Sequence, residues 1–221
     1  MKYIIVVLIF LLNFSTHDDS STSYVKALNI FVDIHEVSVS QFQDFITQTN
    51  YHPSEKAEMK YFDYKTNKWI VSTRLDWKKP NNRFADSDHP VTQVNYKDAC
   101  AYCHHNGGRL PTAEEWTFFA DRFIDGNIWY GLFPFTDYNT DGYKAKMAPI
   151  KQFSANPYGL FDVYGNAWEL TSDTNDLGQV AIKGGSFLCD FSLCSGNQQL
   201  WVSQHNSAND IGFRCVYDKE L

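Results

Sequence analysis

The part of the sequence that follows Asp125 contains short apolar segments but no long stretch of helical or strand periodicity. It is rich in glycine, asparagine, aspartate and aromatic residues, and it shows no internal repeat or linker. Aromatic residues make up 16% of the chain, which excludes global disorder because disordered chains lack such ring content. The sequence therefore predicts one compact, loop-rich α+β domain.

Helical periodicity is confined to the first half of the chain. Residues 28–37 have the composition of a strand, and a helix is expected from Ser38 or Ser40, with Ser40 as a candidate N-cap. Residues 50–90 predict irregular structure with one or two short strands. Further helices are expected over 95–106, capped by Asn95, and over 113–123, where Thr112 and Glu115 form a capping box.

Composition limits the classes of function. With 221 residues, of which 43% are hydrophobic, the chain can bury one sizeable core. The formal net charge is −7 and the pI is about 5.4. Because there is also no Lys/Arg cluster, the chain lacks the electrostatic surface of a nucleic-acid binder.

The N-terminus predicts export. Lys2 precedes an apolar run from Tyr3 to Leu12, which is too short for a bilayer span of about 20 residues. We interpret residues 1–16 as a signal peptide, 17–27 as a leader and 28–221 as the domain. A buried N-terminal strand or an uncleaved anchor is the alternative. We expect a protein that is periplasmic or secreted, with no membrane span.

Five cysteines occur in a chain for which an oxidising compartment is predicted, at 100, 103, 189, 194 and 215. The odd number leaves at least one unpaired thiol if all pairing is internal. Cys189 and Cys194 could converge on one soft metal, and thiolates favour Cu(I), or they could close a local disulfide. A zinc site is disfavoured because the adjacent His104 and His105 cannot both face one centre from a helix.

Several segments together resemble the formylglycine-generating enzyme (sulfatase-modifying factor) family. The quoted segments are HEVSVSQFQDFI (35–46), HPVTQVNYKDACAYC (89–103), GGRLPTAEEW (107–116), YGLFDVYGNAWELTSD (158–173), KGGSFLCDFSLC (183–194) and IGFRCV (211–216). The resemblance covers residues 28–217. It implies a variant of the C-type-lectin-like fold with little regular secondary structure.

The resemblance implies an enzyme that uses copper and O2 to oxidise a cysteine in a sulfatase Cys-x-Pro-x-Arg segment to Cα-formylglycine. Cys189 and Cys194 would bind the copper, while Ser186 and Trp168 match active-site positions. The partners would be an unfolded sulfatase peptide segment and O2, and the enzyme is expected to be a monomer. The alternative is a non-catalytic, calcium-binding lectin-like module, which has no need of the cysteine pair.

The resemblance also implies two calcium sites and one disulfide. Hard cations favour such oxygen ligands. The first site would use Asn127, Ile128, Asp141 and Tyr143; the second would use Asp162, Gly165, Ala167 and Glu169. Cys103 would pair with Cys215, which leaves Cys100 as a free, buried thiol; pairing of Cys100 with Cys103 is the alternative. No arginine occurs in the stretch after Cys194 (SGNQQLWVSQHNSAND), where relatives are often rich in arginine, and this puts the peptide specificity in question.

Overall fold

The computed structural model describes residues 20–120, 125–136, 138 and 140–219. The predicted signal peptide, residues 1–16, lies outside the described residues. In the described part, three helices and ten short strands are joined by long loops, so the expected loop-rich α+β architecture is confirmed. No helix in the described ranges is long and apolar enough to cross a membrane.

The first sheet joins the two ends of the domain. Its strand order is β1 (Thr22–Val25), β2 (Ile30–Asp33) and β10 (Val216–Asp218), with antiparallel pairing throughout. The interpretation of residues 17–27 as a leader was wrong for β1, which is a strand of the domain. Local sequence gave little sign of β1 because its order comes from pairing with β2.

The helices begin at capping residues. Helix α1 (Val39–Thr49) is capped by Ser38, whose hydroxyl accepts from the Gln41 amide at 3.2 Å, so the suggestion of Ser40 as the cap was wrong. Helix α2 (Tyr96–His105) is capped by Asn95 as predicted. Helix α3 (Ala113–Ala120) begins after the predicted capping box, in which Thr112 accepts from the Glu115 amide. Predicted helical residues 121–123 lie outside the described residues.

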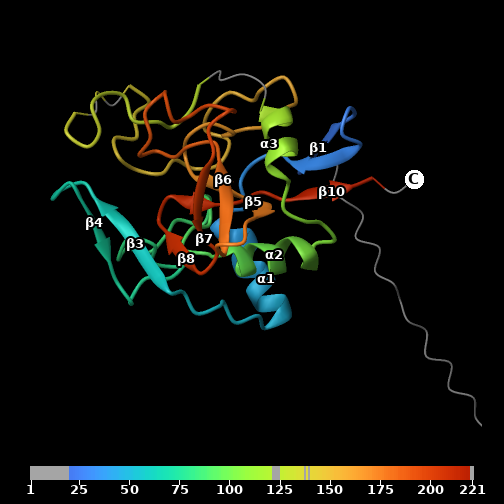
Figure 1. Ribbon diagram of the computed structural model, residues 1–221, viewed down its shortest axis with the longest axis horizontal. Coiled ribbons are helices and arrows are strands. Elements are labelled where there is room, and N and C mark those ends of the chain that lie inside the picture. Colours follow the sequence, from blue (N-terminus) through green and yellow to red (C-terminus); the bar gives the residue numbers. More distant parts are fainter. Residues whose placement is uncertain (1–19, 121–124, 137, 139, 220–221) are drawn as a thin grey trace, which may run out of the picture.

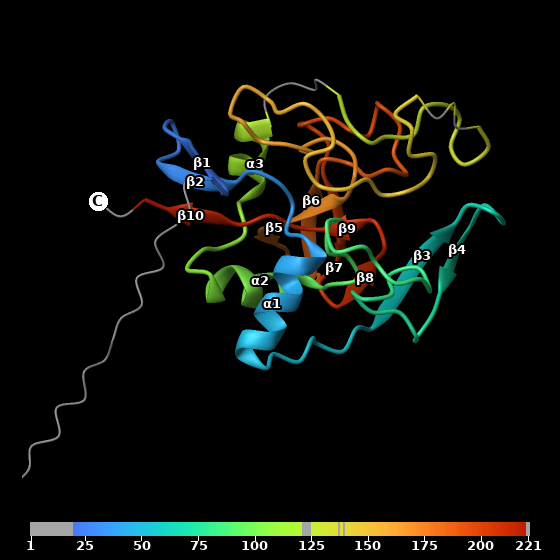
Figure 2. The same ribbon diagram turned by 180° about the vertical axis from the view of Figure 1, so that it is seen from behind.

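Two further sheets occupy the middle and one side of the molecule. The central sheet has the order β7 (Leu200–Ser203), β6 (Gln179–Lys183), β5 (Trp168–Thr174) and β9 (Ile211–Gly212), with β9 parallel to β5. The lateral sheet contains β4 (Lys68–Val71), β3 (Glu58–Asp63) and β8 (Asn206–Ala208). Figure 1 shows the loops that follow α3, in yellow and orange, gathered at one end, with α1 and α2 at the other. From behind, the β3–β4 hairpin projects from one side (Figure 2).

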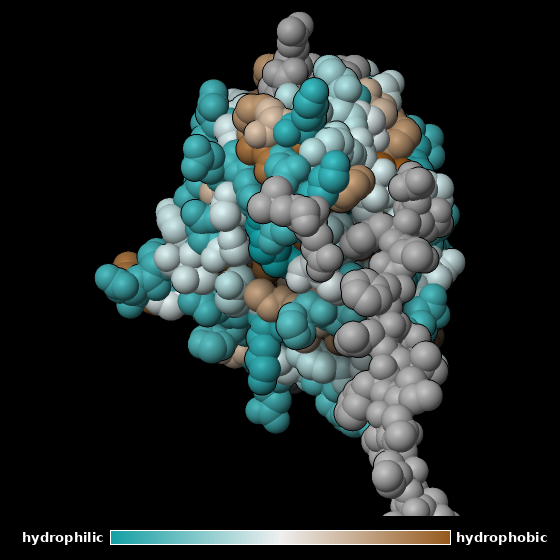
Figure 3. Space-filling view, turned by 90° about the vertical axis from the view of Figure 1, so that its right-hand side faces the viewer, coloured by the Kyte–Doolittle hydropathy of each residue, from teal (hydrophilic) through white to brown (hydrophobic). Residues whose placement is uncertain are grey.

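The main apolar core lies between the helices and the central sheet. Phe42, Tyr102 and Phe213 pack ring against ring within it. On the face shown in Figure 3, hydrophilic residues predominate and apolar residues form small separate areas.

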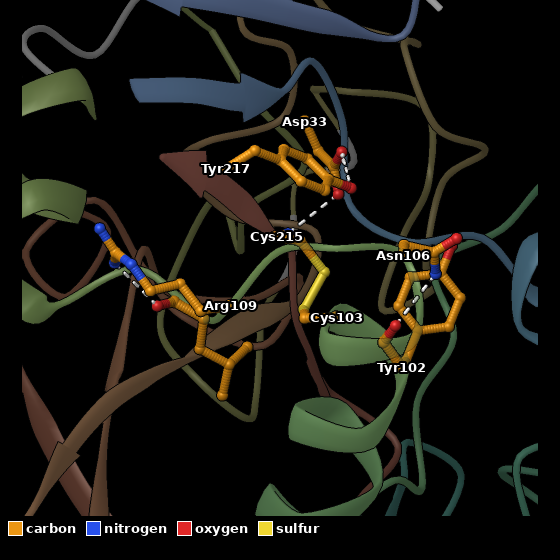
Figure 4. Close-up of a disulfide and its surroundings, with 8 residues drawn as sticks. Asp33, Tyr102, Cys103, Asn106, Arg109, Cys215 and Tyr217 are labelled. Atoms are coloured by element: carbon orange, nitrogen blue, oxygen red, sulfur yellow. Dashed lines mark hydrogen bonds between the residues drawn. A yellow bond between two sulfur atoms is a disulfide. The ribbon is translucent and has the colours of Figure 1, made fainter. Parts of the chain in front are cut away.

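The Cys103–Cys215 disulfide fastens α2 to the segment that enters β10, which confirms the expected pairing (Figure 4). Its two Cα atoms are 5.5 Å apart and 112 positions separate them in sequence. Closing a loop of this length stabilises a fold by about 4–5 kcal/mol in the chain-entropy model. The carboxylate of Asp33 accepts from the Cys215 amide and the Tyr217 hydroxyl beside the disulfide. Cys100 is a free thiol and is half-buried.

Candidate active site

Two glycines bring the segment that follows β6 back over itself. Gly184 and Gly185 have φ angles of 94° and 83°, in the region that favours glycine. A Cβ on Gly185 would collide with the Cys194 sulfur and would lie 3.0 Å from the Cys194 Cα. The absence of a side chain at Gly185 therefore lets the two ends of the 185–194 loop meet.

This loop holds Cys189 and Cys194 as free, buried thiols, with 6% and 1% of their surface exposed. They are not joined by the local disulfide that was considered as an alternative. The Cys189 amide donates to the Ser186 carbonyl at 2.9 Å, and the Cys189 carbonyl accepts from the Trp129 amide at 2.8 Å. Backbone bonds on both sides thus fix the position of Cys189.

The two thiols influence each other's ionisation. A hydrogen bond from Cys194 lowers the pKa of Cys189, against the opposing effect of burial. The same bond, together with burial, raises the pKa of Cys194. Cys189 is therefore the first of the pair to become a thiolate.

Of the other two predicted active-site residues, Ser186 contacts this pair and Trp168 lies in the same apolar core. The Ser186 oxygen is 3.5 Å from the Cys189 sulfur. Trp168 is buried at the start of β5, in the same apolar cluster as both cysteines. The structure thus brings Ser186 and the two cysteines together and places Trp168 in the same apolar core.

Sequence reasoning missed Asp210, which accepts a hydrogen bond from the Ser186 hydroxyl at 3.1 Å. Its backbone carbonyl accepts from the Trp168 amide at 2.8 Å. Burial raises the pKa of Asp210 to about 6. The only sequence signal was its position directly before the quoted segment that begins at Ile211.

The donor set at the cysteines fits a soft monovalent metal. Two converging thiols provide sulfur ligands of the type that Cu(I) prefers. Among the described residues, no group of three or more His, Cys, Asp or Glu side chains is arranged to hold a metal ion. The site therefore offers a metal two sulfur ligands, from Cys189 and Cys194.

The two predicted calcium loops lie against each other. Gly165, with a φ of 77°, approaches so closely that a Cβ there would collide with the Asn127 carbonyl and lie 2.6 Å from Ile128 Cγ2. Asn127 is buried and its amide nitrogen donates to the Lys146 carbonyl at 2.8 Å. Asp141 accepts from the Tyr143 amide at 2.9 Å, so these two predicted ligands share one turn.

In the second predicted set, Asp162 fits a cation ligand better than Glu169 does. Asp162 is buried and its Oδ1 has no hydrogen-bond partner. Both oxygens of Glu169 already accept from Arg214, and one accepts from Trp116 as well. Ala167, a predicted carbonyl ligand, is buried beside Trp168.

Glu36 is a second acidic residue that sequence reasoning missed. It is fully buried, its Oε2 has no hydrogen-bond partner, and Oε1 accepts from the Asn166 amide at 3.1 Å. Burial and then the charge of Asp162 raise the pKa of Glu36, and burial raises that of Asp162 to about 6. Two carboxylate oxygens that lack donors, Oε2 of Glu36 and Oδ1 of Asp162, provide a place for a hard cation. Nothing in the local pattern around residue 36 indicated a partner 126 positions away.

The sequence is similar to one family of known proteins. A model of the sulfatase-modifying factor enzyme 1-like domain matches residues 11–219. The chain is 30% identical to the formylglycine-generating enzyme of Bos taurus over 85% of its own length and 65% of that protein, so it spans less than two thirds of that relative. It is also 29% identical to the inactive C-alpha-formylglycine-generating enzyme 2 of Bos taurus, over 84% of this chain and 76% of that one.

Among solved structures, PvdO from Pseudomonas aeruginosa has a TM-score of 0.63 to this chain, over 86% of this chain and 80% of PvdO. At 15% identity, that likeness shows the fold alone. The C-type-lectin-like variant that the sequence resemblance implied is confirmed.

Proposed function

The chain belongs to the sulfatase-modifying factor enzyme 1-like family, and on this premise we propose that it is a copper- and O2-dependent oxidase that converts a peptide cysteine to Cα-formylglycine. The substrate would be an unfolded sulfatase segment of the type Cys-x-Pro-x-Arg. The observation that carries the proposal is the pair of free, buried thiols at Cys189 and Cys194. A purely structural loop has no need of two unpaired thiols held together.

The chemistry has a defined balance. The peptide cysteine loses its sulfur as sulfide and two electrons, and its β-carbon gains a carbonyl oxygen. O2 accepts four electrons and becomes water, so two further electrons must come from an external thiol reductant. Copper bound by Cys189 and Cys194 would supply a soft centre for the substrate sulfur and for O2.

The chain's own residues have distinct roles in this proposal. The hydrogen bond from Cys194 favours the thiolate of Cys189, which prepares a soft ligand. Ser186 contacts that sulfur, and Trp168 together with the surrounding apolar cluster excludes water. Exclusion of water strengthens the electrostatic interactions inside the site.

Calcium has a structural role in the proposal. The loops that contain Asn127 and Asp162 supply oxygen ligands, and the oxygens of Asp162 and Glu36 that lack donors support the second site. Export, which the N-terminal segment predicts, would place the protein where calcium is available. We also propose that the protein acts as a monomer.

A non-catalytic, calcium-binding module of the same fold is the second candidate, favoured by the similarity to the inactive bovine relative. The two functions differ in the need for Cys189 and Cys194. Mass spectrometry of a Cys-x-Pro-x-Arg peptide incubated with protein, copper, O2 and a thiol reductant tests the choice. We expect the thiol of the peptide to be replaced by a carbonyl oxygen. An unchanged peptide with copper-loaded protein would leave the binding module as the better account.

A further inference from the structure

The Ser186 hydroxyl has three close partners. It lies 3.1 Å from the Asp210 carboxylate, 3.5 Å from the Cys189 sulfur and 3.3 Å from the Leu188 amide nitrogen. Ser186 is fully buried, and both Asp210 and Cys189 are 6% exposed. Water therefore has little access to these contacts, and they must satisfy one another.

The donors and acceptors can be assigned. A hydroxyl has one hydrogen to donate and two lone pairs that accept. The Leu188 N–H can only donate, so it occupies one lone pair. An ionised Asp210 can only accept, and its bond from Ser186 is charge-assisted, so it takes the hydroxyl hydrogen. The second lone pair of Ser186 is what remains to face Cys189.

We propose that Asp210 is a positioning residue that holds the Ser186 hydrogen away from the two thiols, so that Ser186 presents an oxygen lone pair to the Cys189 sulfur. The inference rests on the proposed function where it concerns copper. A hydroxyl that donated to this sulfur would draw electron density from it and compete with a soft metal for its lone pairs. Asp210 prevents that competition.

The backbone around Asp210 holds the carboxylate in place for this role. Its carbonyl accepts from the Trp168 amide where β9 runs parallel to β5. The side chain of the preceding Asn209 accepts from the Phe62 amide at 3.2 Å. Strands on both sides therefore anchor the residue, and its carboxylate reaches Ser186 from the two-residue turn between β8 and β9.

Affinity for Cu(I) tests the proposal independently of turnover. Metal-free protein would compete for Cu(I) with a chromophoric Cu(I) chelator. We expect Asp210→Leu to weaken binding by about 10-fold or more, since partners of metal ligands typically contribute 10–100-fold in affinity. Asp210→Asn keeps an acceptor for the Ser186 hydrogen and should retain most of the affinity.

Two controls separate positioning from charge and from general damage. Asp176→Asn removes one exposed carboxylate from the turn between β5 and β6 and should leave the affinity close to wild type. If Asp210 acts through Ser186, the double variant Asp210→Leu/Ser186→Ala should match Ser186→Ala alone. Losses that multiply in the double variant, or an unchanged affinity in Asp210→Leu, would overturn the proposal.

A second readout needs no metal. The infrared S–H stretching band of Cys189, identified by its loss in Cys189→Ser, reports whether that thiol donates a hydrogen bond. We expect the band to shift in Asp210→Leu and to stay in place in Asp176→Asn. If wild-type protein took up no Cu(I), the proposed oxidase would fail, and the positioning role would stand or fall on this band alone. An unshifted band in folded Asp210→Leu protein would refute it.

Discussion

Arg214 and Glu169 form a bidentate ion pair in the interior of the domain. The Arg214 Nε donates to Glu169 Oε2 at 2.8 Å, and Nη2 donates to Oε1 at 2.7 Å. Neither side chain is accessible beyond 1% of its surface. The remaining guanidinium nitrogen donates to the Asp33 carbonyl, so this one side chain connects β5, β2 and the segment before β10.

Glu169→Gln should lower the free energy of unfolding by about 3–5 kcal/mol, because it leaves the Arg214 charge buried without its partner. Urea denaturation would measure the change. Asp218→Asn is the matched control, since its bond to Arg109 lies at the surface and should contribute less than about 1 kcal/mol. Equal effects of the two substitutions would contradict this prediction.

Each single change, Cys189→Ser and Cys194→Ser, should abolish copper binding and peptide oxidation while the protein stays folded. A hydroxyl is a poor ligand for a soft metal. Copper content and product mass are the measurements. Cys103→Ser should instead lower stability through loss of the disulfide, and it should spare chemistry in the folded fraction. Full oxidase activity in Cys194→Ser protein would refute the two-thiolate site.

Calcium should raise the melting temperature, because a ligand that binds only the folded state stabilises it by mass action. At 100 times the dissociation constant the gain is about 2.7 kcal/mol, or roughly 5–10 °C for a domain of this size. We expect Glu36→Gln to reduce this shift and Asp176→Asn, which alters an exposed carboxylate, to leave it unchanged. If EDTA and excess calcium gave one melting temperature for protein shown to be metal-free, the oxygens of Glu36 and Asp162 would have to share a proton instead.

Gly185→Ala should destabilise the protein and weaken copper binding, because the added Cβ would displace Cys194. Gly178 has a similar φ, of 70°, but has no atom within 4 Å of the position of a Cβ. Gly178→Ala should therefore lower the free energy of unfolding only by the backbone strain, about 1–2 kcal/mol. A loss of copper affinity in both variants would show that the effect is not local.

His35 should make stability depend on pH. Burial lowers its pKa from 6.5 to about 4. Between these values the unfolded state binds the proton and the folded state does not, so stability rises with pH. The contribution is complete above about pH 6.5 and is lost as the pH falls towards 4. Chemical denaturation at several pH values from 4 to 7 would give the free energy of unfolding as a function of pH. That free energy should rise less steeply with pH in His35→Gln protein than in wild type, and an equal rise would contradict the assignment.

The elements that the sequence predicted are those whose signals are local. Asn95 with Asp98, and Thr112 with Glu115, satisfy helix ends within three residues, so the starts of α2 and α3 could be read directly. Strand β1 could not, because its hydrogen bonds go to β2 rather than to its own neighbours.

The same distinction applies to the site. Cys189 and Cys194 are close in sequence and could be recognised as a pair. Asp210 meets Ser186 from 24 positions away, and Glu36 meets Asn166 from 130 positions away. No periodicity or spacing rule spans such distances, so only the folded chain shows these contacts.

The pairing of β2 with β10 sets a condition on when the first sheet can form during folding. Strand β2 lies early in the described part of the chain, yet its second partner does not begin until Val216. Until those last residues emerge, one edge of β2 has open backbone groups, and Cys103 has no sulfur partner. Residues 34–215 must therefore all be available before the first sheet can be completed, and an open strand edge of this kind is a template for aggregation until then.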